Sequence, residues 1–373
     1  MTSPDRTPVS IITGFLGSGK TTLLNRLLQH PGMANAAVII NEFGEIGLDH
    51  LLIATPSENT VLLSNGCLCC TVRGDLVDTL SDLCLKRRDG AIPAFDKVVV
   101  ETTGLADPVP IIQTVVTDPE LAHLFRLDGV VTLVDSVNGA LQLDQHPESV
   151  KQAAIADRIL MTKTDLAQPA VIETLRRRMA CINPGAHIFT VVQGAIAPYE
   201  LFGAELHDAH AAGEDVTRWL REEAFTRAER NRGHQHRSHD HHAPDINRHD
   251  EHIRAFCIYH EEPVSAAGLM MWLGMLAALR GANLLRVKGL LNVEGRPVAV
   301  HAVQTLIHEP VTLENWPDGD RRSRLVFITR DMERAAVEKT LAALRLQADA
   351  LQPARTIDPE VYAQFLAAAK NFR

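Results

Sequence analysis

The sequence lacks the features of a membrane or secreted protein. None of its apolar runs approaches the roughly 18–20 residues that a helix needs to span a bilayer. Its first residues, Met1–Pro8, are polar and carry no signal-peptide pattern. The cysteines are not dispersed as in a disulfide framework, because three of the six fall within four residues. These absences predict a reducing, cytoplasmic location and thiolates that are available to a metal.

Basic residues are fewer than acidic residues in this sequence. The chain has 373 residues, with 37 Lys and Arg against 46 Asp and Glu, and its formal net charge is −9. This balance argues against a protein that binds the phosphate backbone of nucleic acids. The length exceeds that of one ordinary core and predicts two domains, and the hydrophobic fraction of 46% supplies ample apolar material for burial.

Residues 1–205 alternate short β-branched runs with helical patterns, which predicts an α/β domain with a parallel sheet and helices on both faces. Most of the expected strands are near-continuous apolar runs, as in strands buried on both faces. They are Val9–Thr13, Ala37–Asn41, Thr60–Leu63, Lys97–Val100, Gly129–Val134, Arg158–Thr162 and His187–Val192. The expected helices include Thr21–Gln29, Val72–Arg88 and Ala170–Ala180.

The pattern breaks at residues 206–252, where charge is high and seven His fall within nineteen residues. We expect a solvated, His-rich linker with a charged helix at Val216–Arg230. Residues 253–350 then predict a smaller α+β domain, followed by a tail at 351–373. Its expected elements are the strands Arg254–Tyr259, Leu284–Val293, Pro297–His308 and Ser323–Thr329 and the helices Ser265–Leu279 and Met332–Arg345.

A glycine-rich segment follows the first expected strand. From Gly14 to Thr21 it matches Gly-x4-Gly-Lys-[Ser/Thr] between a strand and a helix, which is typical of a phosphate-binding loop. Glycines let backbone N–H groups turn toward an anion, and the following helix adds its positive dipole end. We expect Lys20 to reach the β- and γ-phosphates, Thr21 to ligate Mg²⁺ and Thr22 to contact the α-phosphate. The predicted phosphate-binding residues are Gly14, Gly17, Ser18, Gly19, Lys20, Thr21 and Thr22.

Two later segments predict a second acid and a base-recognition turn. Glu101 follows a buried strand as a Walker B acid does and would hold Mg²⁺ through water, while Gly104 would let a backbone N–H meet the γ-phosphate. In Thr162-Lys-Thr-Asp165, Asp165 would accept both N1–H and N2–H of guanine, and the Lys163 stem would lie over the ring. Thr162 replaces the usual Asn, which weakens base specificity. The pattern favours GTP over ATP, with a structural Glu101 and an ordinary charged turn as alternatives.

Three cysteines cluster between an expected strand and helix, at Cys67, Cys69 and Cys70. Three thiolates select soft or borderline ions such as Zn²⁺, with Co²⁺ or Cu(I) as alternatives. They leave a coordination position open, which suits an exchangeable metal, and Glu42 could fill that position or act near the γ-phosphate. Buried structural thiols and a redox pair at Cys67 and Cys70 are the alternatives. The other cysteines are expected to be small buried hydrophobes: Cys84, Cys181 and Cys257.

In their order along the chain, these motifs resemble those of the CobW-type metallochaperone GTPases, which have a P-loop NTPase fold. The resemblance rests on Gly14–Thr21, Asn41–Glu45, Gly66–Cys70, Glu101–Gly104, Thr162–Asp165, the His-rich segment and, in the second domain, Leu285–Gly289, Trp316 and Leu325–Ile328. It implies slow GTP hydrolysis and a nucleotide-dependent metal site at the three cysteines. It further implies delivery of Zn²⁺ or Co²⁺ to a client protein or enzyme complex. The residues leave two oligomeric states open, a monomer and a nucleotide-dependent homodimer.

We hypothesise that GTP–Mg²⁺ orders the segment Glu42–Asp49 and brings the cysteines into ligand geometry, and that hydrolysis releases the ion. Glu42 and Asp49 are the candidates for the group that activates water. Two other readings of the residues are an ATP-using P-loop kinase or ligase and a passive metal-buffering protein that stores ions on its His run.

Overall fold

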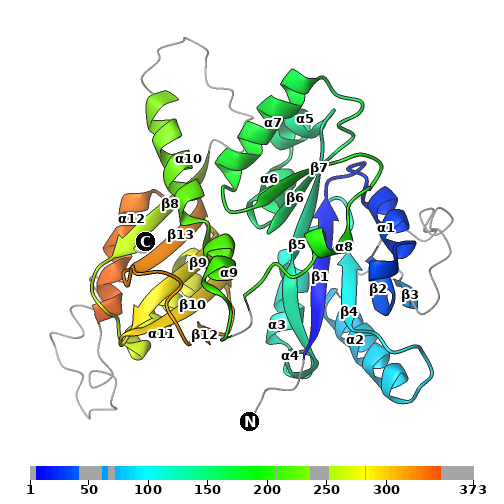
Figure 1. The fold of residues 1–373 in the computed structure, drawn as a ribbon, viewed down its shortest axis with the longest axis horizontal. Coiled ribbons are helices and arrows are strands. Elements are labelled where there is room, and N and C mark those ends of the chain that lie inside the picture. The colour runs from blue at the N-terminus through cyan, green and yellow to red at the C-terminus, as the bar shows by residue number, and fades with distance from the viewer. Residues whose placement is uncertain are drawn as a thin grey trace. The chain divides into compact units, whose positions relative to one another are not determined.

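The computed structural model describes residues 6–41, 61–65, 72–206, 209–235, 252–281 and 283–345. They form two compact units, each with its own sheet (Figure 1). The first unit comprises the described residues up to Met179 together with Ala186–Glu205, and the second comprises Ala180–Gly185 and the described residues from Leu206 onward. Each unit buries its own hydrophobic core.

Within the described residues, the first unit contains a seven-stranded sheet in the order β3-β2-β4-β1-β5-β6-β7. Every pairing is parallel. The strands are β1 (Thr7–Gly14), β2 (Ala36–Asn41), β3 (Val61–Asn65), β4 (Lys97–Glu101), β5 (Phe125–Asp135), β6 (Arg158–Thr162) and β7 (His187–Val191). Parallel strands need crossovers that bring helices onto both faces, which is why these strands are apolar on both sides. The predicted α/β fold is confirmed.

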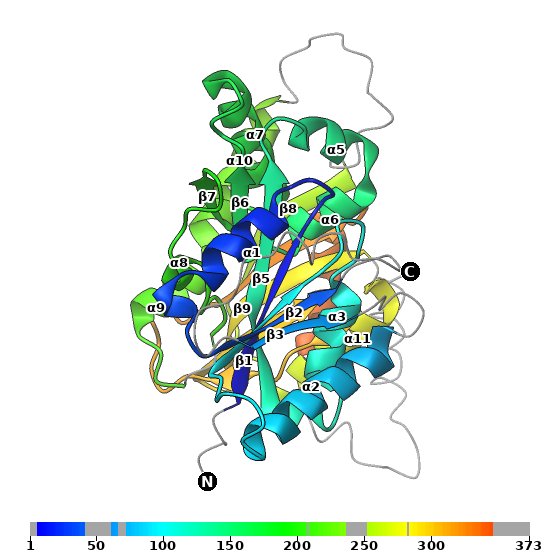
Figure 2. The ribbon, with the colours of Figure 1, turned by 90° about the vertical axis from the view of Figure 1, so that its right-hand side faces the viewer.

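Helices cover both faces of this sheet. The leucines of α1 recur with helical spacing and pack in one core cluster with Ile12 of β1 and Val38 of β2. In Figure 2, α1 lies on one side of the strands, and α2 and α3 lie on the other. The helices are α1 (Lys20–Leu28), α2 (Val72–Arg88), α3 (Val109–Thr117), α4 (Leu121–Leu124), α5 (Gly139–Gln145), α6 (Pro147–Ala154), α7 (Pro169–Ile182) and α8 (Pro198–Leu201), with a 3-10 turn η1 (Pro31–Met33).

The second unit is the predicted α+β domain. Its antiparallel sheet has the order β11-β10-β9-β13-β8, and β12 also pairs with β10. The strands are β8 (Ile253–His260), β9 (Leu284–Val293), β10 (Arg296–Val303), β11 (Leu306–Ile307), β12 (Val311–Thr312) and β13 (Ser323–Arg330). The single strand expected at Pro297–His308 is divided, because Gln304 adopts a left-handed φ of 53° and turns the chain back.

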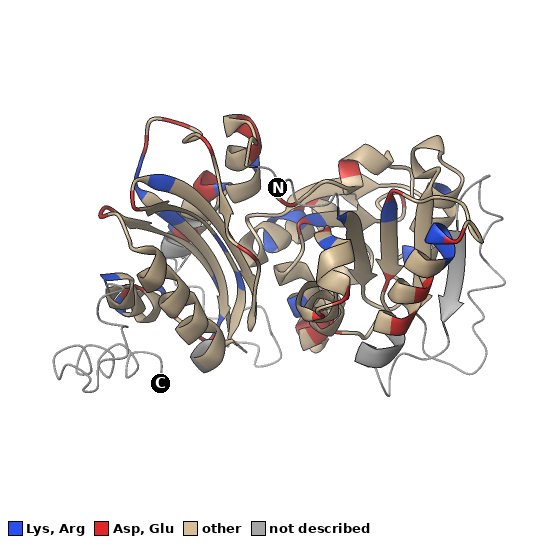
Figure 3. Cartoon of the chain, turned by 90° about the horizontal axis from the view of Figure 1, so that it is seen from below, with Lys and Arg blue, Asp and Glu red and all other residues tan. Residues whose placement is uncertain are grey.

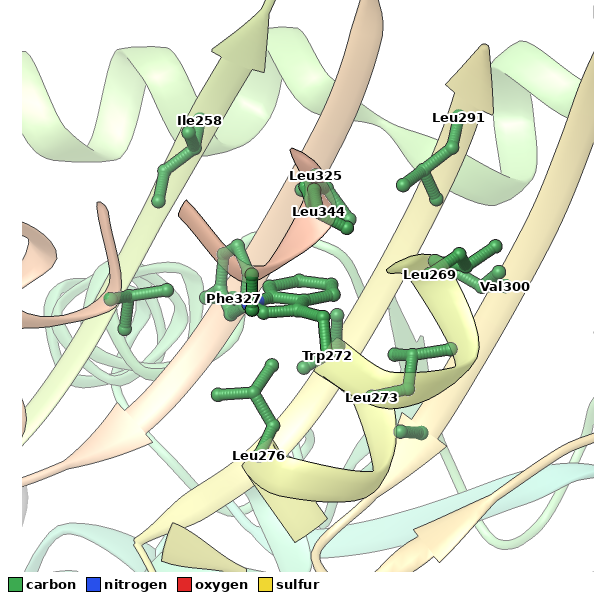
Figure 4. Close-up of a cluster of buried hydrophobic side chains, with 14 of the residues drawn as sticks. Ile258, Leu269, Trp272, Leu273, Leu276, Leu291, Val300, Leu325, Phe327 and Leu344 are labelled. Carbon is green, nitrogen blue, oxygen red and sulfur yellow. The ribbon is translucent and has the colours of Figure 1, made fainter. Parts of the chain in front are cut away.

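One face of the second sheet packs on helix α11 (Ala266–Arg280), while α12 (Arg334–Thr340) and the 3-10 turn η4 (Leu341–Arg345) complete the core. Trp272 lies at its centre beside Phe327 (Figure 4). The indole N–H of the fully buried Trp272 donates to the hydroxyl of Thr340 at 2.9 Å. The polar edge of the largest core side chain is therefore satisfied inside the core.

The strands of this sheet also carry basic residues, visible in blue in Figure 3. Arg286, Lys288 and Arg324 are all less than a tenth exposed. The ammonium of Lys288 lies 5.0 Å from the ring centre of Trp219, and Arg324 pairs with Glu222 at 3.2 Å. Two helices therefore cover charged side chains of this sheet: one places the Trp219 ring against Lys288, and the other places the Glu222 carboxylate beside Arg324.

These two helices, α9 (Gly213–Leu220) and α10 (Glu222–Gln235), stand where the sequence predicts one charged helix in a solvated linker. Arg221 separates them with a left-handed φ of 52°. Val216, Trp219, Leu220 and Phe225 are buried, and this apolar stripe explains why residues 209–235 pack as ordered structure. Most of the His run, residues 236–251, and the tail lie outside the described residues. No helix in the described ranges is long and apolar enough to cross a bilayer.

Candidate functional site

The predicted phosphate loop lies between β1 and α1, at the carboxyl edge of the parallel sheet. Gly14, Gly17 and Gly19 have φ values of 143°, 73° and 96°, which side chains rarely tolerate. A Cβ on Gly14 would also come within 2.5 Å of the carbonyl oxygen of Leu133 in the neighbouring strand. The backbone therefore adopts the predicted glycine-dependent turn.

The side chains of this loop fit an anionic group. Ser18 is fully buried, yet its hydroxyl has no hydrogen-bond partner in the described part of the chain. Lys20 is 9% exposed, and its ammonium donates to the carbonyl oxygen of Gly14 at 2.9 Å. Thr21 is half-buried and Thr22 exposed at the start of α1, whose first turn carries no acidic residue. A buried ammonium, an orphaned hydroxyl and a helix N-terminus suit a polyphosphate.

The loop after β4 lies directly against the phosphate loop. Glu101 is 6% exposed at the end of β4, and β4 pairs with β1. The hydroxyl of Thr102 donates to that of Thr13 at 2.8 Å. A Cβ on Gly104 would come within 2.6 Å of the backbone nitrogen of Leu16, so only glycine allows this approach. The structure thus brings the predicted Glu101 and Gly104 beside the phosphate loop.

Helix α6 holds this second loop, a feature that the sequence reasoning missed. The side-chain amide of Gln152, 1% exposed, donates to the carbonyl oxygens of Gly104 at 3.3 Å and Ala106 at 3.0 Å. Its neighbour Lys151 forms an ion pair with Asp107. These contacts join positions 44 to 48 residues apart and have no local sequence signal.

The predicted base turn begins where β6 ends, on the same edge of the sheet. Thr162 is buried, Lys163 has a left-handed φ of 55°, and Asp165 is exposed. The ammonium of Lys163 donates to Asp135 Oδ2 at 2.7 Å. The turn therefore presents the exposed carboxylate of Asp165 beside Lys163, whose ammonium is held by Asp135.

Asp135 is a second residue that the sequence reasoning missed. It ends β5, is 1% exposed, and also accepts hydrogen bonds from the backbone of Val137 at 2.7 Å and from both nitrogens of Asn138. Burial alone would raise the pKa of Asp135, but the hydrogen bonds from Lys163 and Asn138 and from the backbone lower it. The sequence signal that could have identified Asp135 is its position as an acidic residue at the end of a buried apolar strand.

The candidate metal ligands Cys67, Cys69, Cys70 and Glu42 lie outside the described residues. Their flanks are described: β2 ends at Asn41 and β3 at Asn65, and α2 begins at Val72. Asn41 and Asn65 are paired partners across the two strands. The chain thus enters both segments from neighbouring positions, since paired strands lie about 4.8 Å apart.

Within the described residues, no group of three or more His, Cys, Asp or Glu side chains could hold a metal ion. Cys257 is buried, and burial is the main cause that raises the pKa of its thiol to about 12. Cys84 and Cys181 are only half-buried, unlike the sequence-based expectation, and burial raises the pKa of Cys84 as well. Cys84 and Cys257 therefore lack the lowered thiol pKa that a thiolate site requires, and none of the three cysteines belongs to a metal-binding cluster within the described residues.

Comparison with known proteins places this geometry in context. Residues 8–190 match the nucleotide-binding domain model of CobW/HypB/UreG, and residues 253–345 match the cobalamin synthesis protein CobW C-terminal domain. Over 339 residues the chain is 34% identical to the zinc chaperone YjiA of Escherichia coli K12, covering 90% of this chain and 98% of that protein. The crystal structure of Zn(II)-bound YjiA GTPase from E. coli matches with a TM-score of 0.66 and 31% identity, over 91% of this chain and 99% of that one.

A further relative is the zinc-regulated GTPase metalloprotein activator 1 of Schizosaccharomyces pombe. It is 35% identical over 220 residues, which cover 57% of this chain and 51% of that protein.

Proposed function

The chain belongs to the CobW family of the CobW/HypB/UreG group, and we propose that it is a GTP-hydrolysing metallochaperone for Zn²⁺. The main support for this proposal is that the relevant segments lie at the same edge of one parallel sheet. The phosphate loop, the base turn and the paired residues Asn41 and Asn65 are all at the carboxyl ends of its strands. Ligands of open α/β sheets bind at this edge. A nucleotide site and a thiolate site placed there can influence each other.

In this proposal, GTP lies with its phosphates over Gly14–Thr22 and its base against Lys163 and Asp165. Thr21 and Glu101 would hold Mg²⁺, which neutralises phosphate charge when it is bound. Lys20 would supply a positive charge that is buried and positioned in advance. Hydrolysis then depends mainly on positioning and charge stabilisation, which agrees with a slow, regulatory turnover.

Zn²⁺ is the cargo in this proposal, and Co²⁺ is the competing ion. Cys67, Cys69 and Cys70 would bind it as thiolates, with Glu42 completing the site. Glu42 is the first residue after β2 and Cys67 the second residue after β3, and the two strands are paired, so a nucleotide that orders one segment would bias the other. Coupling requires that GTP binds the metal-competent arrangement more tightly than the alternative.

Release of the ion to a client metalloprotein or metal-inserting enzyme complex would complete the cycle. The names of the relatives support this step, because one is a zinc chaperone and another a GTPase metalloprotein activator. A client is needed physically, since an exchangeable site delivers its ion only to a competing set of ligands.

Metal binding and GTP turnover by cysteine variants test the proposal. Cys67→Ala combined with Cys69→Ala should abolish tight Zn²⁺ binding in competition with a chromophoric chelator. The matched control is Cys84→Ala, a half-buried thiol outside the cluster, which should bind Zn²⁺ like the parent protein. Tight Zn²⁺ binding by the double variant, or the absence of GTP hydrolysis in the parent protein, would contradict the proposal.

A further inference from the structure

An open groove lies in the second unit at the turn between β9 and β10. Its volume is about 360 Å³, and residues of this turn, of β12 and of the loop from β12 to β13 line it. The lining includes the half-buried Trp316 and the exposed Arg296 and Arg321. We propose that this Trp316 groove docks an acidic peptide segment of a partner protein, with an apolar side chain between its carboxylates. The groove goes beyond the proposed function, because its described lining includes no residue predicted to bind nucleotide or metal.

Part of the groove is apolar. Leu313 is 3% exposed, and its backbone N–H donates to the carbonyl oxygen of the buried Pro297 at 2.9 Å. The indole N–H of Trp316 donates to the carbonyl oxygen of Gly295 at 3.4 Å. An indole that is held at one edge offers a large apolar surface with few rotamers to fix, which is why tryptophan is common at the centres of binding surfaces. The groove can therefore take up an apolar side chain.

The two sides of the groove are held together by one buried side chain. Asn292 is 7% exposed, and its amide nitrogen donates to the backbone carbonyl oxygen of Arg321 at 2.9 Å. Its amide oxygen accepts from the backbone N–H of Gly295, also at 2.9 Å. A groove whose walls are fixed before binding loses less conformational entropy when it takes up a ligand.

The charges that line the groove are unequal. Arg296 and Arg321 carry exposed guanidinium groups that make no hydrogen bond or ion pair in the described part of the chain. The acidic residue of the lining is Glu314, and its carboxylate already lies 2.9 Å from Nδ1 of His210. Two guanidinium groups therefore stand against one carboxylate, and each guanidinium can hold a partner's carboxylate through two parallel hydrogen bonds.

Other carboxylates of this loop are engaged elsewhere. Asp318 pairs with Arg324 at 2.7 Å, and Asp320 pairs with Arg322 at 2.8 Å. These ion pairs leave the two groove arginines to a ligand. Because the whole chain has a net charge of −9, such a local basic site would select acidic segments mainly by its own charges.

The neighbouring strand favours a peptide over a small anion. Strand β12 lies beside β10 (Figure 1), and β10 is the strand that pairs with it among the described residues. Since Leu313 bonds to Pro297, the next pair, Thr312 and Val298, is not hydrogen-bonded, and the backbone polar groups of Thr312 point away from β10. An extended peptide can pair with such an edge while its side chains enter an adjacent groove.

The test uses a short fluorescent peptide in which leucine lies between glutamates, and a second peptide with glutamine in place of each glutamate. Binding to the full-length chain is measured by anisotropy with a metal chelator and without nucleotide. We expect only the acidic peptide to bind, and more weakly at high salt. Arg296→Gln combined with Arg321→Gln should weaken binding about fivefold or more, the scale of two exposed ion pairs. Trp316→Leu should weaken it about tenfold.

The matched control removes the same two charges elsewhere in the second unit. Arg227→Gln combined with Arg230→Gln, at exposed positions of α10, should bind the acidic peptide like the parent protein. Glu314→Gln should raise the affinity about twofold, because it removes the like charge from the groove.

Three results would overturn the proposal. They are equal binding of both peptides by the parent protein, equal losses in the two arginine pairs, and complete displacement of the peptide by an equimolar amount of citrate. The last would identify a site for a small anion. Thermal unfolding checks that each variant folds, and the exposed arginines keep the test decisive if Trp316→Leu does not fold.

Discussion

Single buried side chains hold the residues of the candidate site in position by hydrogen bonds. Asp135 illustrates this: it accepts hydrogen bonds from Lys163, Val137 and Asn138, and these lower its pKa in the folded protein. A lowered pKa means that the carboxylate stabilises the fold above its ordinary pKa of about 3.9. That contribution is lost as the pH falls through the lower, native value.

Replacing Asp135 with Asn tests this role. The variant should lose about 1–3 kcal/mol of unfolding free energy at pH 7, the scale of a charged hydrogen bond, and it should bind GTP more weakly because Lys163 loses its anchor. The difference in urea midpoint between the parent protein and the variant should shrink as the pH falls below about 4. A difference that stays constant over this range would exclude the assigned role.

At the residue scale, the sequence predicted the parts of the site that depend on backbone geometry. Gly14, Gly17 and Gly19 stand at positive φ, as the loop pattern requires, and Gly104 packs against the backbone of Leu16. Asp135 and Gln152 escaped prediction because they act across tertiary contacts rather than within a motif. The roles of the cysteines stay a prediction.

Among the helices and strands, those with a local sequence pattern were predicted, whereas those that depend on tertiary packing were not. The strands of the first unit were predictable because buried parallel strands are continuous apolar runs. The helices α9 and α10 were predicted as one solvated helix, since charged and polar residues surround Val216 and the adjacent Trp219 and Leu220. Only the sheet beneath them shows that this stripe is buried. Strand β12, with two residues, is too short to leave a pattern.

The element that supports the Glu101–Gly104 loop is α6, which gives a prediction at this scale. Gln152→Met keeps the length of the side chain but removes the donors to Gly104 and Ala106. We expect slower GTP hydrolysis with little change in GTP affinity, and a loss of about 1 kcal/mol of stability for each hydrogen bond. Single-turnover hydrolysis and nucleotide titration measure the two effects.

Gln145→Met is the matched control for this variant. Gln145 ends the neighbouring helix α5, is exposed, and its side-chain amide makes no hydrogen bond in the described part of the chain. The control should hydrolyse GTP like the parent protein. If Gln152→Met also matched the parent in hydrolysis rate, α6 would not position the loop.

On the scale of the whole molecule, the His run is flanked on both sides by the second unit. Helix α10 precedes it and β8 follows it, and these two elements contact each other. Replacing residues 236–251 with a Gly/Ser sequence of equal length should therefore leave the fold, GTP hydrolysis and tight Zn²⁺ binding unchanged. Weakly held Zn²⁺ should decrease, because neutral imidazoles recruit metal near pH 7. Loss of tight binding, measured by chelator competition, would place the main site in the His run.

The central claim is that the nucleotide site and the candidate thiolate site are coupled through the shared edge of one sheet. The most direct test is the Zn²⁺ affinity of the full-length chain with Mg²⁺ and a non-hydrolysable GTP analogue, compared with GDP and with no nucleotide. Typical coupling energies of about 1–3 kcal/mol predict a Zn²⁺ affinity about five- to 150-fold higher with the analogue. Equal Zn²⁺ affinity in all three states would contradict the account.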